Sequence, residues 1–215
     1  MEKILVSACL LGEKTRYDGE SNEESLLSRV REAYDLVPFC PEVEGGLPIP
    51  RPKAEIRKGN VYREDGTNVT SFYLSGAEKA VKLCRLLSIR IAILKESSPA
   101  CGVHEIHDGR FKGNKIPGMG LMAEALKREG IRLLSEKDLP AFIEELEKKE
   151  QAKAEHKAKA IAKEQPKVEE KPLPKKPFRP KARKTQGRPG PSRSRKPGYG
   201  KGFKKPYKAK KKDGR

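Results

Sequence analysis

Residues 89–101 read IRIAILKESSPAC, an apolar run that ends in a polar turn and a cysteine. Two more cysteines follow runs of the same kind, because KILVSAC ends at Cys9 and DLVPFC ends at Cys40. Short apolar runs bounded by turn residues predict buried strands. The loops beyond the carboxyl ends of the strands in an open parallel α/β sheet emerge side by side. We therefore expect Cys9, Cys40 and Cys101 to converge on one site.

The fourth cysteine has a different setting. Cys84 lies in AEKAVKLCRLLS, whose apolar residues recur at helical spacing. A free cysteine in such a pattern behaves as a small core hydrophobe. We expect Cys84 to be a buried helix residue.

Strand and helix signals alternate along the first 150 residues, which favours an α/β fold with a doubly wound, mostly parallel sheet. A proline- and glycine-rich stretch over residues 41–56 predicts an irregular loop that can line a pocket. Residues 103–117 predict a long loop, with a hairpin as an option. The expected strands are Lys3–Ala8, Leu36–Phe39, Val61–Arg63, Ile89–Leu94 and Ile131–Leu134. Four helices are expected. The first begins near Ser21–Glu24, and the second runs from Asn68 or Thr70 to Leu87. The third runs from Met119 to Arg128 before Gly130, and the fourth follows a Ser135 cap with Asp138 in its first turn.

Charge divides the chain into two parts. Residues 1–150 contain 24 Lys and Arg against 25 Asp and Glu, whereas residues 151–215 contain 24 against 5. We expect one folded domain over residues 1–148, a usual length for a single hydrophobic core. Residues 149–215 are expected to form a tail that is helical at its start and disordered from Pro166, because its composition buries too little apolar area.

Neither a secretory signal nor an apolar run long enough to span a membrane is expected, which predicts a cytoplasmic protein without a membrane partner. In a reducing compartment, widely spaced cysteines favour metal binding or catalysis over disulfides. Three thiolates are one short of a closed structural zinc site and of a fully cysteine-ligated iron–sulfur cubane. Whatever they hold would keep one position open or take a different fourth ligand.

Two other site chemistries remain open from the residues alone. His104 and His107 follow Cys101 closely enough for a zinc site with three cysteines and one histidine, although structural zinc usually uses paired C-x2-C knuckles. His104 could instead serve as the base for a cysteine nucleophile, which would leave two cysteines unexplained.

The motifs together carry a family resemblance. VSACLLG at 6–12, RYDG at 16–19, VPFCPEVEGGLPIPRP at 37–52 with AEI, a helix containing Gly-Ala, and AILKESSPACG at 92–102 with a downstream DG resemble the 2-thiouracil desulfurase (TudS) family. These motifs run through most of residues 1–135.

This resemblance implies a Rossmann-like α/β domain that holds a 4Fe-4S cluster through Cys9, Cys40 and Cys101, with one iron open to the sulfur of a thiolated pyrimidine. It implies the replacement of that sulfur by oxygen from water, without net redox change and with release of sulfide. The substrate would be a free base resembling 2-thiouracil or thiouridine in RNA.

The resemblance also implies a catalytic glutamate and a serine. The glutamate corresponds to Glu42 or Glu44, and the serine before the third cysteine corresponds to Ser98. Many relatives have a second serine where this chain has Ala100, so one hydroxyl is missing here.

Each of these residues also has a simpler interpretation. Glu42 and Glu44 could be solvated loop carboxylates, and Ser98 could cap a turn. Asp18 could only form the turn before Gly19, and Arg51 could hold a substrate carbonyl or pair with Glu55 at the surface.

The tail suggests a different class of function. Its cationic residues are interleaved with Phe178, Tyr199, Phe203 and Tyr207, a pattern suited to phosphate attraction and base stacking. We expect possible RNA contact through residues 151–215, with a solubilising extension as the plain alternative. The alternative function is an RNA-binding protein with a structural zinc or iron–sulfur site, and the oligomeric state stays open.

Overall fold

Four parallel strands form the central sheet of the computed structural model, which describes residues 1–164 and their side chains through residue 159. The strands follow the order β2-β1-β5-β8. They are β1 (Lys3–Ser7), β2 (Asp35–Phe39), β5 (Ile91–Leu94) and β8 (Arg132–Ser135). The buried runs predicted as strands therefore pair with one another.

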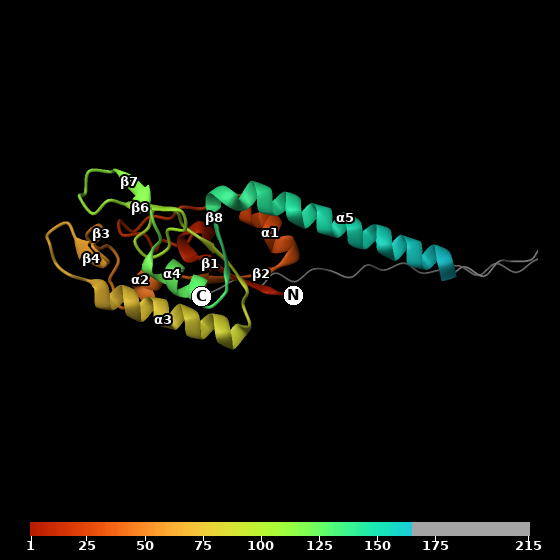
Figure 1. Ribbon diagram of the computed structural model, residues 1–215, viewed down its shortest axis with the longest axis horizontal. Coiled ribbons are helices and arrows are strands. Elements are labelled where there is room, and N and C mark those ends of the chain that lie inside the picture. Colours follow the sequence, from red (N-terminus) through yellow and green to blue (C-terminus); the bar gives the residue numbers. More distant parts are fainter. Residues whose placement is uncertain (165–215) are drawn as a thin grey trace, which may run out of the picture. The chain divides into compact units, whose positions relative to one another are not determined.

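Helices cover both faces of this sheet (Figure 1). One face packs against α3 (Thr70–Leu87) and α4 (Leu121–Arg128), and the other packs against α1 (Leu27–Ala33) and α5 (Leu139–Glu164). Successive side chains of a strand point to opposite faces, so Leu5 belongs to the first core. Its neighbours Ile4 and Val6 belong to the second core. The predicted doubly wound α/β architecture is confirmed.

The strand order places a topological switch between β1 and β5. The chain leaves β1 for β2 on one side and later returns to pair β5 on the other side of β1. Ser7 pairs in register with Phe39, so β1 and β2 end at the same level. Ligands of open α/β sheets bind in the crevice beyond the carboxyl ends at such a switch.

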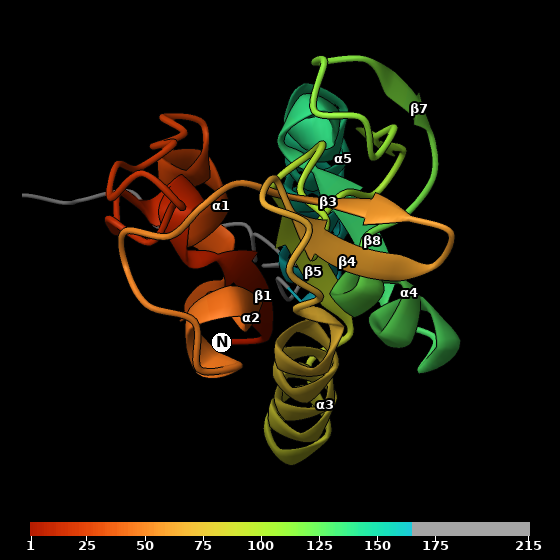
Figure 2. The ribbon, with the colours of Figure 1, turned by 90° about the vertical axis from the view of Figure 1, so that its left-hand side faces the viewer.

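Two antiparallel hairpins lie at that end of the sheet (Figures 1 and 2). The first pairs β3 (Ala54–Arg57) with β4 (Asn60–Arg63), and the second pairs β6 (Glu105–His107) with β7 (Lys115–Pro117). The hairpin that the sequence allowed within residues 103–117 is present. Because β3 contacts β6, the two hairpins form one wall.

The prediction of an irregular loop over residues 41–56 is wrong at both of its ends. Pro41–Glu44 forms a short helix, α2, and residues 54–57 form β3. Proline suits the first helical position because its missing N–H has no partner there anyway. The Gly76 side of α3 lies so close to α2 that a Cβ on Gly76 would fall 1.9 Å from the Pro41 carbonyl oxygen. Tertiary packing thus stabilises α2 in a stretch whose proline and glycine content predicts no helix.

Several element boundaries differ from the expected ones. β1 ends at Ser7 and is followed by a 3-10 helix, η1 (Ala8–Leu11), and α1 begins at Leu27 rather than near Ser21–Glu24. The Ser135 cap is confirmed, since it forms a capping box with Asp138 over η2 (Glu136–Asp138). Cys84 is buried within α3, as its spacing predicted.

The last helix, α5, continues through residues 149–164, in line with their helix-forming composition. A domain boundary at residue 148 stays a prediction. The expected disorder from Pro166 and the aromatic residues of the tail lie outside the described residues. Within residues 1–164, no helix combines the length and the apolar character that a membrane span needs.

Candidate active site

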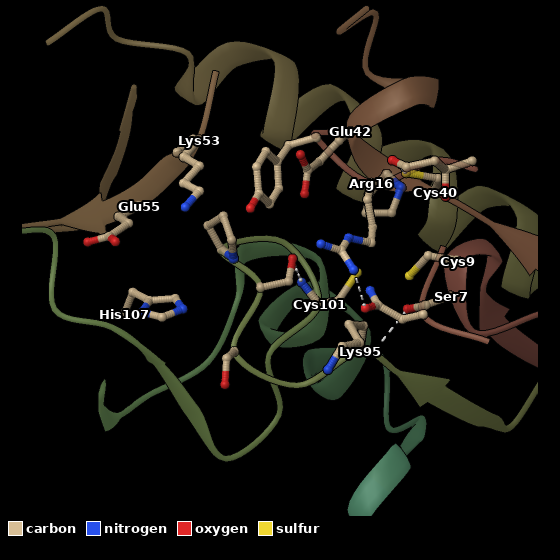
Figure 3. A pocket seen from close by; sticks show the side chains of 18 of the residues that line it. Ser7, Cys9, Arg16, Cys40, Glu42, Lys53, Glu55, Lys95, Cys101 and His107 are labelled. Atoms are coloured by element: carbon tan, nitrogen blue, oxygen red, sulfur yellow. Dashed lines mark hydrogen bonds between the residues drawn. The ribbon is translucent and has the colours of Figure 1, made fainter. Parts of the chain in front are cut away.

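A pocket of about 450 Å³ lies beyond the carboxyl ends of the sheet strands. Cys9 follows β1, Cys40 follows β2 and Cys101 lies in the loop after β5, and all three line this pocket (Figure 3). Residues separated by 92 positions meet because parallel strands end at one edge. The structure brings the three predicted cysteines together, and Cys84 stays apart from them.

The three thiols share a buried, mutually interacting environment. Burial raises the pKa of Cys101 well above its ordinary value, and the neighbouring Cys40 and Cys9 raise it further, while Ser7 opposes the shift. Burial is also the largest cause of the raised pKa of Cys9 and of Cys40. Metal binding by these thiols would displace their protons.

Glu42 lines the same pocket and is held by Arg51. Arg51 Nε donates to Glu42 Oε2 at 2.7 Å, and Arg51 Nη2 donates to the carbonyl oxygen of Thr15 at 2.9 Å. The Arg51 side chain is only 3% exposed. Tyr73 of α3 also interacts with Glu42, and burial, followed by the Glu42 carboxylate, raises the pKa of Tyr73. Arg51 thus fixes one carboxylate oxygen and ties the loop after β1 to the loop after β2.

The interpretation of Arg51 as a surface partner of Glu55 is therefore wrong. Arg51 is buried, and its partners are Glu42 and loop carbonyl groups. Glu55 accepts instead from the backbone N–H of Phe111 at 3.0 Å.

Ser98 lines the pocket beside Cys101. Its Oγ accepts from the backbone N–H groups of Ala100 at 3.1 Å and Cys101 at 3.2 Å. Ser98 caps the turn that carries the third cysteine, as the simple interpretation held. The hydroxyl proton is not used in these two bonds, so it can still be donated into the pocket.

The loop that carries Ser98 and Cys101 is organised around Glu96, which is 3% exposed. Glu96 Oε1 accepts from the backbone N–H groups of four residues at 3.0–3.2 Å: Ser97, Val103, His104 and Glu105. Although burial opposes ionisation, these donors hold the pKa of Glu96 below its ordinary value.

The wall opposite the thiols carries Lys53, Glu55 and His107 from the two hairpins (Figure 3). Among the described residues, three buried side-chain polar atoms have no hydrogen-bond partner in the protein, and all three belong to the pocket lining: Thr15 Oγ1, Glu96 Oε2 and His107 Nδ1. Unsatisfied buried polar groups are rare and require an explanation. A water molecule or a ligand in the pocket would satisfy these three atoms.

Three residues considered from the sequence lie outside the pocket lining. The Glu44 side chain is exposed, and Asp18 Oδ2 accepts from Arg16 Nη2 at 2.5 Å within its own turn. His104 Nε2 pairs with Asp138 Oδ2 at 2.9 Å. His104 is therefore not placed as a base for Cys101 or as a fourth ligand, whereas His107 does line the pocket.

The three thiols of the pocket are ligands that soft metal ions favour. In the part of the chain that the structure describes, no three His, Cys, Asp or Glu side chains are placed to hold one metal ion. Tetrahedral zinc needs every ligand atom within roughly 2.3 Å of one centre. A cluster distributes its ligands over several metal ions, and its irons favour thiolate sulfur. Cys9, Cys40 and Cys101 could hold such a cluster with one metal ion left open.

Much of the pocket was not found by sequence reasoning. Lys95 and Glu96 directly follow β5, so the strand-end argument used for the cysteines applies to them as well. Tyr73 faces the pocket from the interior of α3, and Phe111 lies in a hairpin loop. Neither position carries a recognisable motif, so only the tertiary structure shows them.

Three comparisons agree on the relatives of this chain. The model of the 2-thiouracil desulfurase family matches residues 4–138. An uncharacterized protein of Bacillus subtilis strain 168, YbbK, is 36% identical over 146 residues, which span 63% of this chain and 97% of that protein. A solved structure described as the 4Fe-4S-dependent thiouracil desulfidase TudS is 45% identical, with a TM-score of 0.64, and the match covers 68% of this chain and 99% of the other.

Proposed function

Because this chain belongs to the 2-thiouracil desulfurase family, we propose that it is an iron–sulfur enzyme that removes sulfur from a thiolated pyrimidine. The observation that carries the proposal is the pocket at the end of the sheet. It gathers three buried thiols, the Arg51-bound carboxylate of Glu42 and the hydroxyl of Ser98. Free bases such as 2-thiouracil are the proposed substrate class.

Cys9, Cys40 and Cys101 would hold the cluster, since they are the thiols of the pocket. When bound, a 4Fe-4S cluster with one open iron supplies a Lewis acid with affinity for soft sulfur. A hydrogen bond joins two of the strand ends that carry these cysteines. Ser7 Oγ accepts from the backbone N–H of Lys95 at 3.0 Å, which ties the end of β1 to the end of β5.

Glu42 would act on water. Arg51 holds its Oε2, and the carboxylate would accept a proton from a water molecule that attacks the ring carbon. Glu44 points to the exterior of the domain, so Glu42 is the carboxylate that we assign to this role. Arg51 would be a positioning residue, because it acts by holding Glu42.

Ser98 would act on the substrate through its hydroxyl proton. Two backbone N–H groups fix the position of Oγ, so the proton can be aimed at a heteroatom of the pyrimidine. The net change converts a thiocarbonyl group and water into a carbonyl group and hydrogen sulfide. No electrons are gained or lost, so no external reductant is needed.

The tail supports a second proposal, that residues 151–215 contact RNA. The supporting observation is their charge, 24 Lys and Arg against 5 Asp and Glu, with four interleaved aromatic residues. A cationic segment attracts phosphates without reading sequence, and aromatic rings stack on unpaired bases. Such contact would tether thiolated RNA to the chain that carries the pocket.

The enzyme proposal is tested on anaerobically reconstituted protein, by measuring iron, acid-labile sulfide, zinc and the sulfide released from 2-thiouracil. We expect about four irons per chain in a wild-type protein that releases sulfide. Cys101→Ala should lose both activity and iron.

Cys84→Ala is the matched control, because Cys84 is a buried cysteine outside the pocket. It should keep iron and activity. Stoichiometric zinc without iron in the wild type, or equal activity of both cysteine variants, would contradict the proposal and favour a binding protein with a structural metal.

A further inference from the structure

Phe111 combines three properties that neither folding nor the proposed chemistry explains. Its backbone has φ = +58°, in the left-handed region that bulky side chains avoid. The residue lines the pocket and is partly exposed. It belongs to neither hydrophobic core cluster of the described residues.

The loop around Phe111 is held in this conformation by specific contacts. The buried carboxylate of Glu55 accepts from the Phe111 backbone N–H at 3.0 Å. The loop is closed by Asp108, whose backbone N–H donates to the Asn114 carbonyl oxygen at 3.1 Å. A Cβ at Gly109 would lie 2.6 Å from the Ile56 carbonyl oxygen, so the loop is pressed against β3. A strained residue that is fixed at a pocket commonly serves the pocket.

The other aromatic residues of the pocket are already engaged. The ring of Tyr17 lies under Lys53 Nζ at 5.4 Å and under the Arg16 guanidinium at 5.9 Å. Tyr73 lies against Glu42, and Phe39 is buried in the core. None of the ring–ring or cation–ring contacts found among the described residues involves Phe111. Among the described residues, Phe111 is thus the pocket aromatic that has neither a ring–ring or cation–ring contact nor a place in a core cluster.

We propose that Phe111 is the stacking platform for the planar ring of the substrate and that Glu55 is the positioning residue that holds it. The inference rests on the proposed function, because it takes a pyrimidine as the ligand. Aromatic side chains bind bases by stacking on their faces, independently of the exocyclic groups. The platform would therefore fix the plane of the ring while the thiols and Glu42 act at its edge.

The test uses the full-length reconstituted protein and compares wild type with Phe111→Gly, Phe111→Tyr and Ile116→Ala. Glycine relieves the left-handed strain and removes the ring. Phe111→Gly should thus keep or raise the thermal midpoint, while KM for 2-thiouracil rises about tenfold or more and kcat stays within about twofold. The dissociation constant of the product uracil should rise in parallel.

Two comparisons separate this role from a structural one. Phe111→Tyr keeps an aromatic face and should retain the wild-type KM. Ile116→Ala removes an exposed apolar side chain of the same hairpin outside the pocket lining and should change neither constant. Glu55→Ala should raise KM, and Glu55→Gln, which keeps an acceptor, should restore it.

The outcomes distinguish this inference from the proposed function. Sulfide release by the wild type, together with unchanged KM and uracil binding in Phe111→Gly, would overturn the platform and leave the enzyme proposal standing. Phe111-dependent binding of uracil in a wild type that releases no sulfide would overturn the enzyme proposal and leave the platform standing.

Discussion

The proposed chemistry depends at the residue scale on which carboxylate faces the pocket. Glu42 and Glu44 are two positions apart, yet the α2 turn buries most of the first and exposes the second. Arg51 then holds Glu42 by a buried, charge-assisted hydrogen bond. Two positions on this short helix, about 200° of rotation, separate a candidate base from a surface carboxylate.

We expect Glu42→Gln to lower kcat for desulfuration by about a hundredfold or more, because the amide cannot take the proton from water. Iron content should be unchanged, since no ligand is altered. Glu44→Gln is the matched control and should keep wild-type kcat. Steady-state sulfide release together with iron analysis checks both, and a larger loss in Glu44→Gln would reverse the assignment.

At the element scale, the approach of α2 to α3 determines where Cys40 and Glu42 lie. Gly76 permits this approach, because any Cβ there would meet the Pro41 backbone. Gly45, at the end of α2, also permits the approach, because a Cβ there would fall 2.1 Å from the Phe72 carbonyl oxygen of α3. The Gly-Ala pair in the middle of a helix is therefore a packing requirement of the site.

Gly76→Ala should lower the free energy of unfolding by about 3 kcal/mol, although helix propensity alone would raise it by about 1 kcal/mol. Iron incorporation should fall as well, because α2 directly follows Cys40. Ser75→Ala on the same helix should stay within about 0.5 kcal/mol of wild type. Denaturant unfolding measures these values, and a stabilised Gly76→Ala protein would refute the packing argument.

The cap before α5 predicts a pH dependence of stability. Asp138 Oδ2 accepts from Ser135 and pairs with His104. The hydrogen bond with Asp138 raises the pKa of His104 above its ordinary value of about 6.5. The protonated form thus favours the folded state, and this contribution is complete below pH of about 6.5 and is lost as pH rises through the raised pKa.

The thermal midpoint of wild type should therefore exceed that of His104→Gln at pH of about 5.5, and the difference should shrink above neutral pH. Asp138 stays ionised over this range, since its pKa is lowered. Thermal unfolding at a series of pH values checks this. A difference that is constant with pH would show that the pair contributes no charge-dependent stability.

The whole molecule combines a nearly neutral folded part with a strongly cationic tail. The structure describes residues 1–164, and the family match ends at residue 138. The pocket is built entirely from residues 7–115, so the tail supplies none of its lining. Desulfuration of the pyrimidine and contact with RNA would thus be carried out by different parts of the chain.

Truncation after Pro166 should leave sulfide release from free 2-thiouracil unchanged and weaken binding of single-stranded RNA by more than about tenfold at low salt. The full-length protein should show the steeper fall of affinity with salt concentration. Replacing Phe178, Tyr199, Phe203 and Tyr207 by alanine keeps the charge and separates stacking from phosphate attraction. Equal RNA affinity of the truncated and full-length proteins would remove the proposed RNA role.

The sequence by itself determined the α/β class, the central strands and the convergence of Cys9, Cys40 and Cys101. These follow from local periodicity and from the general geometry of parallel strands, which put strand ends at one edge. The sequence also placed Cys84 in a helix core. It could not choose between Glu42 and Glu44, predict α2, or identify Glu55 and Phe111.

Only the tertiary structure decided those points, and the reason is physical. The α2 turn exists because glycine backbones let two helices touch, and Phe111 faces the pocket because a carboxylate 56 positions away holds its N–H. Contacts between segments distant in the chain leave no local periodicity. Whether such contacts form depends on how the two segments pack in the folded protein.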